Sequence, residues 1–151
     1  MKPLILKTTL AALALLPCTI TAAVETVPAA QPATSPPAAG TASPGIVLSP
    51  TFTTGIEGDE PTEYLSEIEN TQPTVYFFTE LEALNGQTAI HRWKYQDRVM
   101  AEVKIPVTSP RMKAWSSMSM QPQWTGVWVV EVVNGRGEVI STNTFAYIEP
   151  L

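Results

Sequence analysis

The sequence predicts an all-β fold, an immunoglobulin-like antiparallel β-sandwich of seven or eight strands that follows a disordered tether. Beyond position 45, short apolar runs separated by turn residues recur about every 8 to 12 residues, a spacing typical of sandwiches rather than of helices. All tryptophan, phenylalanine and tyrosine residues lie at or after Phe52, so only this part can build a core. A chain of 151 residues holds one or at most two ordinary domains, which excludes a large multidomain enzyme.

The expected strands divide the domain, residues 46–151, at its turn residues. Their ranges are Ile46–Thr54, Glu63–Glu69, Thr74–Glu80, Thr88–Tyr95, Val99–Val107, Lys113–Met118, Gly126–Val133 and Val139–Ile148. The strongest hairpin signal is the segment Asn134-Gly135-Arg136-Gly137, because asparagine and glycine accept the positive φ angles of tight turns. Residues 85–86 supply a similar turn, and residues 96–98 a second hairpin. Only residues 81–85 could hold a helical turn.

Alternation along the strands predicts which side chains face the core. In the strand at 88–95, one face carries Ala89, His91, Trp93 and Tyr95. If Trp93 is in the core, Arg92 and Lys94 point outward. Residues 75–78 and 127–130 are apolar on both faces, which is typical of central strands.

The first residues have the pattern of a secretory signal peptide, predicted at residues 1–23. Lys2 and Lys7 precede an uncharged stretch rich in leucine and alanine, which ends in small residues at Ala23. This stretch is shorter than the roughly 20 residues that a membrane-spanning helix needs. We therefore expect cleavage after Ala23 and no stable transmembrane span afterwards, with a retained anchor as the alternative.

Residues 24–45 are predicted to be a disordered linker, because proline and alanine recur there without any aromatic residue. The only cysteine is Cys18, whose sequence context resembles a lipoprotein processing site in which Pro17 is unfavourable. If the signal is removed, no cysteine remains for a disulfide or a thiol nucleophile. The expected location is outside the cytoplasm, in the periplasm or associated with the envelope.

The charge of the chain argues against a nucleic-acid partner. The net charge is −5, and removal of Lys2 and Lys7 would leave seven basic against 14 acidic side chains, about −7. Phosphate binding needs a basic footprint, which such a protein lacks. Residues 57–82 are acidic without a basic residue, whereas residues 92–113 are mainly basic. The two blocks either pair across neighbouring strands or lie on solvated faces, or the basic block meets an acidic partner.

Four separated motifs in order carry a family resemblance. They are Tyr76-Phe77-Phe78-Thr79-Glu80-Leu81, His91-Arg92-Trp93, Trp115-Ser116-Ser117 and Trp124-Thr125-Gly126-Val127-Trp128. With them, the chain resembles an uncharacterised bacterial family, domain-of-unknown-function family 2914, over about residues 52–147. The resemblance implies a domain at the C-terminal end of exported or membrane-attached bacterial proteins. It implies no activity, cofactor or catalytic residue.

Several catalytic and metal-binding chemistries lack their residues. His91 is the only histidine, so a zinc site would lack ligands, and the serines at 116–117 do not lie in a G-x-S-x-G turn. The acidic turn at 57–60 lacks the ligand spacing of an EF-hand. Glu80 and Glu82, two residues apart, are a weak basis for glycoside hydrolysis, which needs paired carboxylates. We expect no enzymatic activity, no cofactor and no metal.

The tryptophans are the better guide to function. Trp124 is the candidate for exposure because it lies at a loop-to-strand junction. The candidate ligand or partner surface consists of Trp124, Arg92, Lys94 and Arg111. The leading hypothesis is a non-enzymatic exported interaction module that binds another envelope protein. The alternatives are a carbohydrate-binding module for a cell-wall or envelope polysaccharide, through Trp124 with Arg92 and Arg111, and a glycoside hydrolase.

Overall fold

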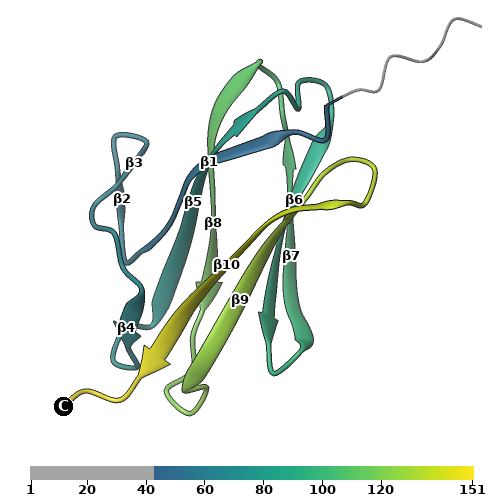
Figure 1. Ribbon diagram of the computed structural model, residues 1–151. Helices are drawn as coiled ribbons and strands as arrows, with labels where there is room; N and C mark the ends of the chain where they lie inside the picture. The colour runs from purple at the N-terminus through teal and green to yellow at the C-terminus, as the bar shows by residue number, and fades with distance from the viewer. Residues whose placement is uncertain (1–42) are drawn as a thin grey trace, which may run out of the picture. The chain divides into compact units, whose positions relative to one another are not determined.

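A computed structural model describes residues 43–151, which form a sandwich of two main β-sheets (Figure 1). These residues contain no helix, so none in this part of the chain is long and apolar enough to cross a membrane. The all-β class predicted from the sequence is confirmed. The expected signal peptide at 1–23, Cys18 and nearly all of the expected linker lie outside the described residues.

Residues 43–151 contain ten strands. The seven long ones are β1 (Ile46–Thr53), β5 (Thr74–Glu82), β6 (Thr88–Tyr95), β7 (Arg98–Pro106), β8 (Arg111–Ser119), β9 (Gly126–Val133) and β10 (Val139–Ile148). The three short ones are β2 (Ile56–Glu57), β3 (Glu60–Pro61) and β4 (Glu67–Glu69). Each long strand agrees with an expected strand to within two residues at either end. Residues 81–85 are not helical, because β5 continues through Glu82.

The strand expected at Glu63–Glu69 is wrong in its first half. Only residues 67–69 form β4, and the chain before them makes the small β2–β3 hairpin. The turn of this hairpin needs positive φ, which Gly58 (54°) and Asp59 (64°) supply. Within the expected range, Leu65 makes an isolated bridge to Phe52, and its amide donates to the Phe52 carbonyl at 2.9 Å, so this part of the chain is bonded to β1 and not to β10.

The order of the strands gives the sandwich its immunoglobulin-like topology. One sheet has the order β1-β5-β8, and the other has the order β4-β10-β9-β6-β7. All pairings are antiparallel except that of β4 with β10, which is parallel. In the letters used for immunoglobulin domains, β5 and β8 correspond to strands B and E, and β6, β9 and β10 correspond to C, F and G. The segment from β1 to β4 crosses from one sheet to the other.

The core between the sheets is mainly aromatic. Its fully or almost fully buried rings are Phe52, Phe77, Trp93, Trp128, Phe145 and Tyr147. The Phe52 and Phe145 rings, from opposite sheets, have centroids 4.6 Å apart, and Trp93 and Phe145 are 6.3 Å apart. Each ring removes roughly 150–250 Å² from water, so this cluster is the main source of hydrophobic stabilisation. As the alternation predicts, Trp93 faces the core while its neighbours Arg92 and Lys94 face outward.

Two hairpin turns occur where the sequence places them. The β6–β7 turn consists of Gln96 and Asp97, both with positive φ (49° and 61°). In the β9–β10 turn, the side-chain oxygen of Asn134 accepts hydrogen bonds from the amides of Arg136 (2.9 Å) and Glu138 (3.0 Å). In this turn the residue with positive φ is Gly137 (82°), whereas the sequence led us to expect it at Asn134 or Gly135.

Candidate functional site

Arg92 and Lys94 lie on the outer face of the five-stranded sheet and are paired within it. Arg92 Nε is 2.7 Å from Glu102 Oε1, and Lys94 Nζ is 2.9 Å from Glu131 Oε1. Arg92 Nη1 also reaches Glu131 at 3.4 Å. The pKa of Glu131 lies below its ordinary value, mainly because Lys94 donates a hydrogen bond to it. These cations are therefore partly neutralised by neighbouring strands.

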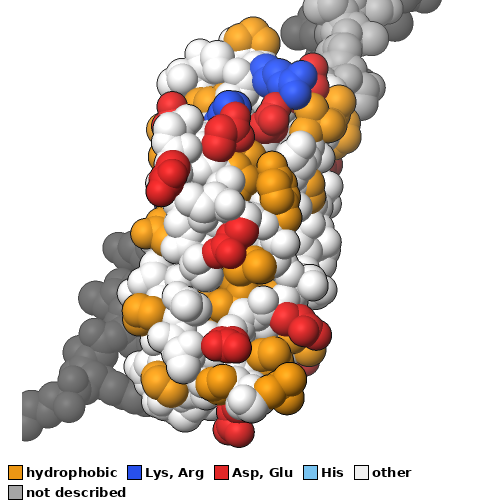
Figure 2. Space-filling view, turned by 90° about the vertical axis from the view of Figure 1, so that its left-hand side faces the viewer, with side chains coloured by type: hydrophobic (Ala, Val, Ile, Leu, Met, Phe, Trp, Pro, Cys, Tyr) orange, Lys and Arg blue, Asp and Glu red, His pale blue; other side chains and the backbone are white. Residues whose placement is uncertain are grey.

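Arg111 belongs to the opposite sheet. Its Nη2 lies 2.6 Å from Glu80 Oε2 on β5, and the next outward residue of β8, Lys113, pairs with Glu60 of β3. These contacts join the acidic block of the sequence to part of its basic block, from β5 to its neighbour β8 and from β3 of the small hairpin to β8. On the side of the sandwich where β2 and β3 lie, lysine and arginine side chains gather near one end, beside acidic ones (Figure 2). The bond to Arg111 also occupies Glu80, one of the two carboxylates considered for hydrolysis.

Trp124 is half-buried in the loop between β8 and β9, rather than exposed as expected. Its ring centroid is 5.9 Å from that of Trp128, and its carbonyl accepts a hydrogen bond from Trp128 Nε1 at 3.0 Å. The more exposed tryptophan is Trp115, which retains 38% of its accessible surface. Alternation could have identified it, because Trp115 has the same parity as the charged Arg111 and Lys113.

Trp124 lines a groove of about 460 Å³, which we call the Trp124 groove. Its other lining residues are Tyr95, Gln96, Arg98, Met100 and Gln123. The β6–β7 hairpin and the β8–β9 loop form it, and both lie at the lower end of the sandwich in Figure 1. The four residues selected from the sequence thus do not form one surface: Arg92 and Lys94, Arg111, and Trp124 occupy three separate places.

The interior of the Trp124 groove is held rigidly, whereas its rim is polar. The Tyr95 ring stacks on Trp128 with centroids 4.8 Å apart, and the Tyr95 hydroxyl donates to the carbonyl of Thr125 at 2.8 Å. Arg98 is exposed, and no ion pair joins it to any residue in the range 43–151. The groove therefore combines fixed aromatic rings with a charge that is free of internal partners in the described part. Neither Arg98 nor Met100 was selected from the sequence.

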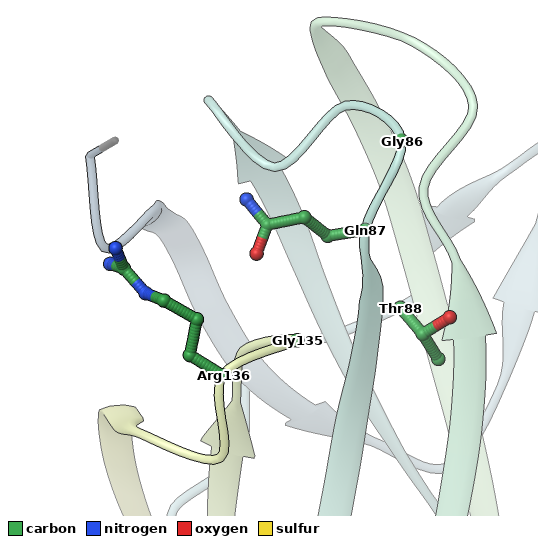
Figure 3. Close-up of a pocket in the computed structure, with 5 residues that line it drawn as sticks. All are labelled: Gly86, Gln87, Thr88, Gly135 and Arg136. Carbon is green, nitrogen blue, oxygen red and sulfur yellow. The ribbon is translucent and has the colours of Figure 1, made fainter. Parts of the chain in front are cut away.

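A second pocket, of about 550 Å³, lies at the opposite end of the five-stranded sheet. Residues 86–88 and 135–136 line it. Figure 3 shows Gln87 and Arg136 pointing to one side, whereas Thr88 points away from them. Arg136 Nη2 is bound to Glu138 Oε2 at 3.0 Å. This pocket has no aromatic floor, and its cation is already engaged.

A chain of hydrogen bonds lies buried between the sheets and joins three of the four family motifs. Trp93 Nε1 donates to Ser116 Oγ at 3.0 Å, and Ser116 Oγ lies 3.0 Å from His91 Nδ1. His91 Nε2 lies 3.2 Å from Thr79 Oγ1, which donates to the carbonyl of Ala114 at 3.3 Å. Each group uses its donor once if His91 is neutral with its proton on Nε2. In this arrangement Ser116 donates to His91 Nδ1, and every side-chain nitrogen and oxygen atom of the network has a hydrogen-bond partner.

This network stabilises the fold and is not built as a catalytic dyad. His91 is fully buried and Ser116 is 4% exposed, so a substrate has no access to either. Burial lowers the pKa of His91 from 6.5 to about 4. No carboxylate among the described residues hydrogen-bonds to the imidazole. Residues 43–151 also contain no group of three or more histidine, cysteine, aspartate or glutamate side chains placed to hold a metal.

Residues 86–147 match a family model described as "Protein of unknown function (DUF2914)". No curated protein matches the chain. The matched segment covers β6 to β9 and all but the last residue of β10, with the His91, Ser116 and Trp128 motifs, whereas the motif around Thr79 precedes it. The match is thus narrower than the range of about 52–147 expected from the motifs. Over residues 86–147, this match supports the resemblance to the DUF2914 family of proteins of unknown function.

Proposed function

We propose that this protein is a non-enzymatic exported interaction module whose Trp124 groove binds a segment of another envelope protein. The composition of the groove carries the proposal. Protein interfaces and their hot spots are enriched in tryptophan, tyrosine, methionine and arginine. The groove contains one residue of each type: Trp124, Tyr95, Met100 and Arg98. A rigid aromatic site also loses little conformational entropy when a partner binds.

The position of the groove supports this role. The first described residues lie at the other end of the sandwich, where the carbonyl of Pro44 accepts a hydrogen bond from Asn134 Nδ2 at 2.9 Å. The β9–β10 turn that contains Asn134 and the loops of the Trp124 groove are at opposite ends in Figure 1. If residues 24–45 act as a tether, the groove faces away from the point of attachment and is open to a partner.

The chemistry of the groove specifies the kind of segment that fits. Met100, Trp124 and Tyr95 offer apolar surface, while Arg98 offers a charge without an internal partner in the described part of the chain. A segment with an apolar side chain next to a carboxylate would satisfy both. Because the charged contact is an attraction between Arg98 and a carboxylate at the surface, we expect binding to weaken as salt screens it.

Site-specific photo-crosslinking in cells tests the proposal. A photoreactive residue at position 123, which lines the groove and leaves Arg98 in place, should give one stoichiometric crosslinked protein from the envelope fraction. The same residue at position 104 is the control, because Lys104 is exposed on strand β7, outside the groove. Equal crosslinking from both positions, or no stoichiometric product from position 123, would contradict protein binding at the groove.

Polysaccharide binding is the second candidate, favoured by the same groove. The aromatic side chains of Tyr95 and Trp124 suit stacking on sugar rings, and Gln96, which also lines the groove, has an amide that can hydrogen-bond to hydroxyl groups. Affinity electrophoresis against envelope polysaccharides separates the candidates. Retardation that is lost in Trp124→Ala and kept in Lys104→Ala would favour the polysaccharide, provided that far-UV circular dichroism shows both variants to be folded. If no polysaccharide retards the protein, the polysaccharide candidate is contradicted and the protein partner remains the proposed ligand of the groove.

A further inference from the structure

The two main sheets end in four edge strands, and three of these carry features that prevent pairing with another chain. Natural edges are protected by short length, charges, proline or bulges. β4 has three residues, two of them glutamate. β1 contains Pro50 and a register shift, and β7 contains Pro106, a register shift and charged side chains. β8 differs, because its nine residues pair with β5 without a register shift and include no proline. Its charged residues, Arg111 and Lys113, are confined to its first three positions.

The free edge of β8 presents a regular row of backbone hydrogen-bonding groups. Beyond the two ends of the β5–β8 ladder, Ala83 N donates to Pro110 O at 3.1 Å and Met120 N donates to Pro73 O at 2.9 Å. Hydrogen-bonded pairs alternate in an antiparallel ladder, so the even-numbered residues of β8 bond to β5. The odd-numbered residues direct their N–H and C=O groups to the free edge, where no other described strand pairs with them. They are Arg111, Lys113, Trp115, Ser117 and Ser119.

Apolar side chains accompany this edge. Trp115, at the middle of the strand, points outward and is 38% exposed. Met112 and Met118 face the core but remain half-buried, as does Ile105 on β7, because both strands are at the edges of their sheets. A strand added to β8 would cover the tryptophan and shield these residues from water.

We propose that β8 pairs antiparallel with β8 of a second copy of the chain, about a two-fold axis at Trp115. The two three-stranded sheets would then become one continuous sheet of six strands. Trp115 would exchange backbone hydrogen bonds with its own counterpart, and the two indole rings would lie side by side on the outer face.

Charge selects this register. With the axis at Trp115, Lys113 lies opposite Ser117 and Arg111 lies opposite Ser119 of the other copy, so no like charges meet. With the axis at Lys113, two lysines would face each other, which destabilises a pair of strands. With the axis at Ser117, only residues 115–119 would overlap. The Trp115 register alone pairs the whole strand. Because no residue of β8 lines the Trp124 groove, the proposal does not depend on the function of that groove.

Disulfide trapping in the full chain tests both the interface and its register. The substitutions Trp115→Cys and Ser117→Cys are made separately in a Cys18→Ser background, which removes the only native cysteine. Across the proposed axis, the two positions 115 have Cα atoms about 5.5 Å apart, which a disulfide can bridge. The two positions 117 lie four residues apart along the strands, about 13 Å. We expect a disulfide-linked dimer from Trp115→Cys and none from Ser117→Cys.

Sedimentation velocity tests association without a cysteine. The N–H of Ser117 points to the free edge, so Ser117→Pro removes no hydrogen bond to β5. We expect this variant to be monomeric with an unchanged circular dichroism spectrum, whereas the unsubstituted chain and Ser117→Thr are dimeric. Arg98→Glu, in the groove, should leave the dimer intact. A monomeric unsubstituted chain, a dimeric Ser117→Pro variant, or equal crosslinking at positions 115 and 117 would overturn the proposal.

Discussion

Ser116 is the residue on which the buried hydrogen-bond chain depends most. Its hydroxyl accepts from Trp93 Nε1 and lies 3.0 Å from His91 Nδ1, so it links two other motifs at once. In the sequence, Ser116 and Ser117 are adjacent serines of one motif, and alternation places them on opposite faces of a strand without showing which hydroxyl has buried partners. Only the packing makes Ser116 buried and Ser117 exposed.

We predict that Ser116→Ala lowers the free energy of unfolding by about 2–4 kcal/mol, because it leaves the Trp93 N–H donor and the His91 Nδ1 acceptor buried without partners. Ser117→Ala is the matched control and should change stability by less than about 0.5 kcal/mol. Urea unfolding of the two variants measures both values. Similar losses in both would contradict the role assigned to the buried hydroxyl.

His91 should make the stability of the protein depend on pH. Its pKa is about 4 in the folded protein and 6.5 in the unfolded chain, so the unfolded chain binds more protons between these values. Stability is therefore complete above pH 6.5 and decreases as the pH falls toward 4, by as much as about 3 kcal/mol. Urea unfolding at pH 7, 6 and 5 measures the slope, and His91→Gln should remove most of it. An unchanged slope in that variant would assign the effect to other groups.

The β6–β7 turn lies where the sequence predicts it, but its residues are not the ones that best suit its backbone conformation. Gln96 and Asp97 both have positive φ, which suits asparagine and glycine better. The turn nevertheless forms, because the β6–β7 pairing holds Tyr95 opposite Arg98. The turn also places Tyr95 and Arg98 at the Trp124 groove. The β6–β7 pairing thus holds the turn in a backbone conformation that its own residues do not favour.

We predict that the double variant Gln96→Asn, Asp97→Gly is more stable by about 1 kcal/mol, because both new residues accept positive φ at low cost. The midpoint of urea unfolding should rise. Asp97→Ala is the control and should lower it, because alanine has no local hydrogen bond to favour the left-handed region. A lower midpoint in the double variant would show that the native side chains make contacts that outweigh the backbone preference.

The candidate site was the part of the molecule that the sequence predicted least well. Arg92, Lys94 and Arg111 were selected because they are basic and near tryptophans in the sequence. In the fold, Arg92 and Lys94 lie on one sheet and Arg111 lies on the other. Each forms an ion pair with an acidic residue, for example Lys94 with Glu131 and Arg111 with Glu80. Sequence proximity does not specify which strands become neighbours, so it reveals neither ion pairs nor the residues that meet at a groove.

The all-β class, all seven long strands of residues 43–151 and the two main hairpin turns follow from the amino-acid sequence. These features depend on alternation and on local φ preferences, which are properties of neighbouring residues. Only the three-dimensional fold shows that Ser116, His91, Trp93 and Thr79 meet in the core, that Trp124 packs on Trp128, and that β8 is an edge with neither proline nor bulge. These features depend on the order of strands in each sheet, which is set by contacts between residues far apart in the chain.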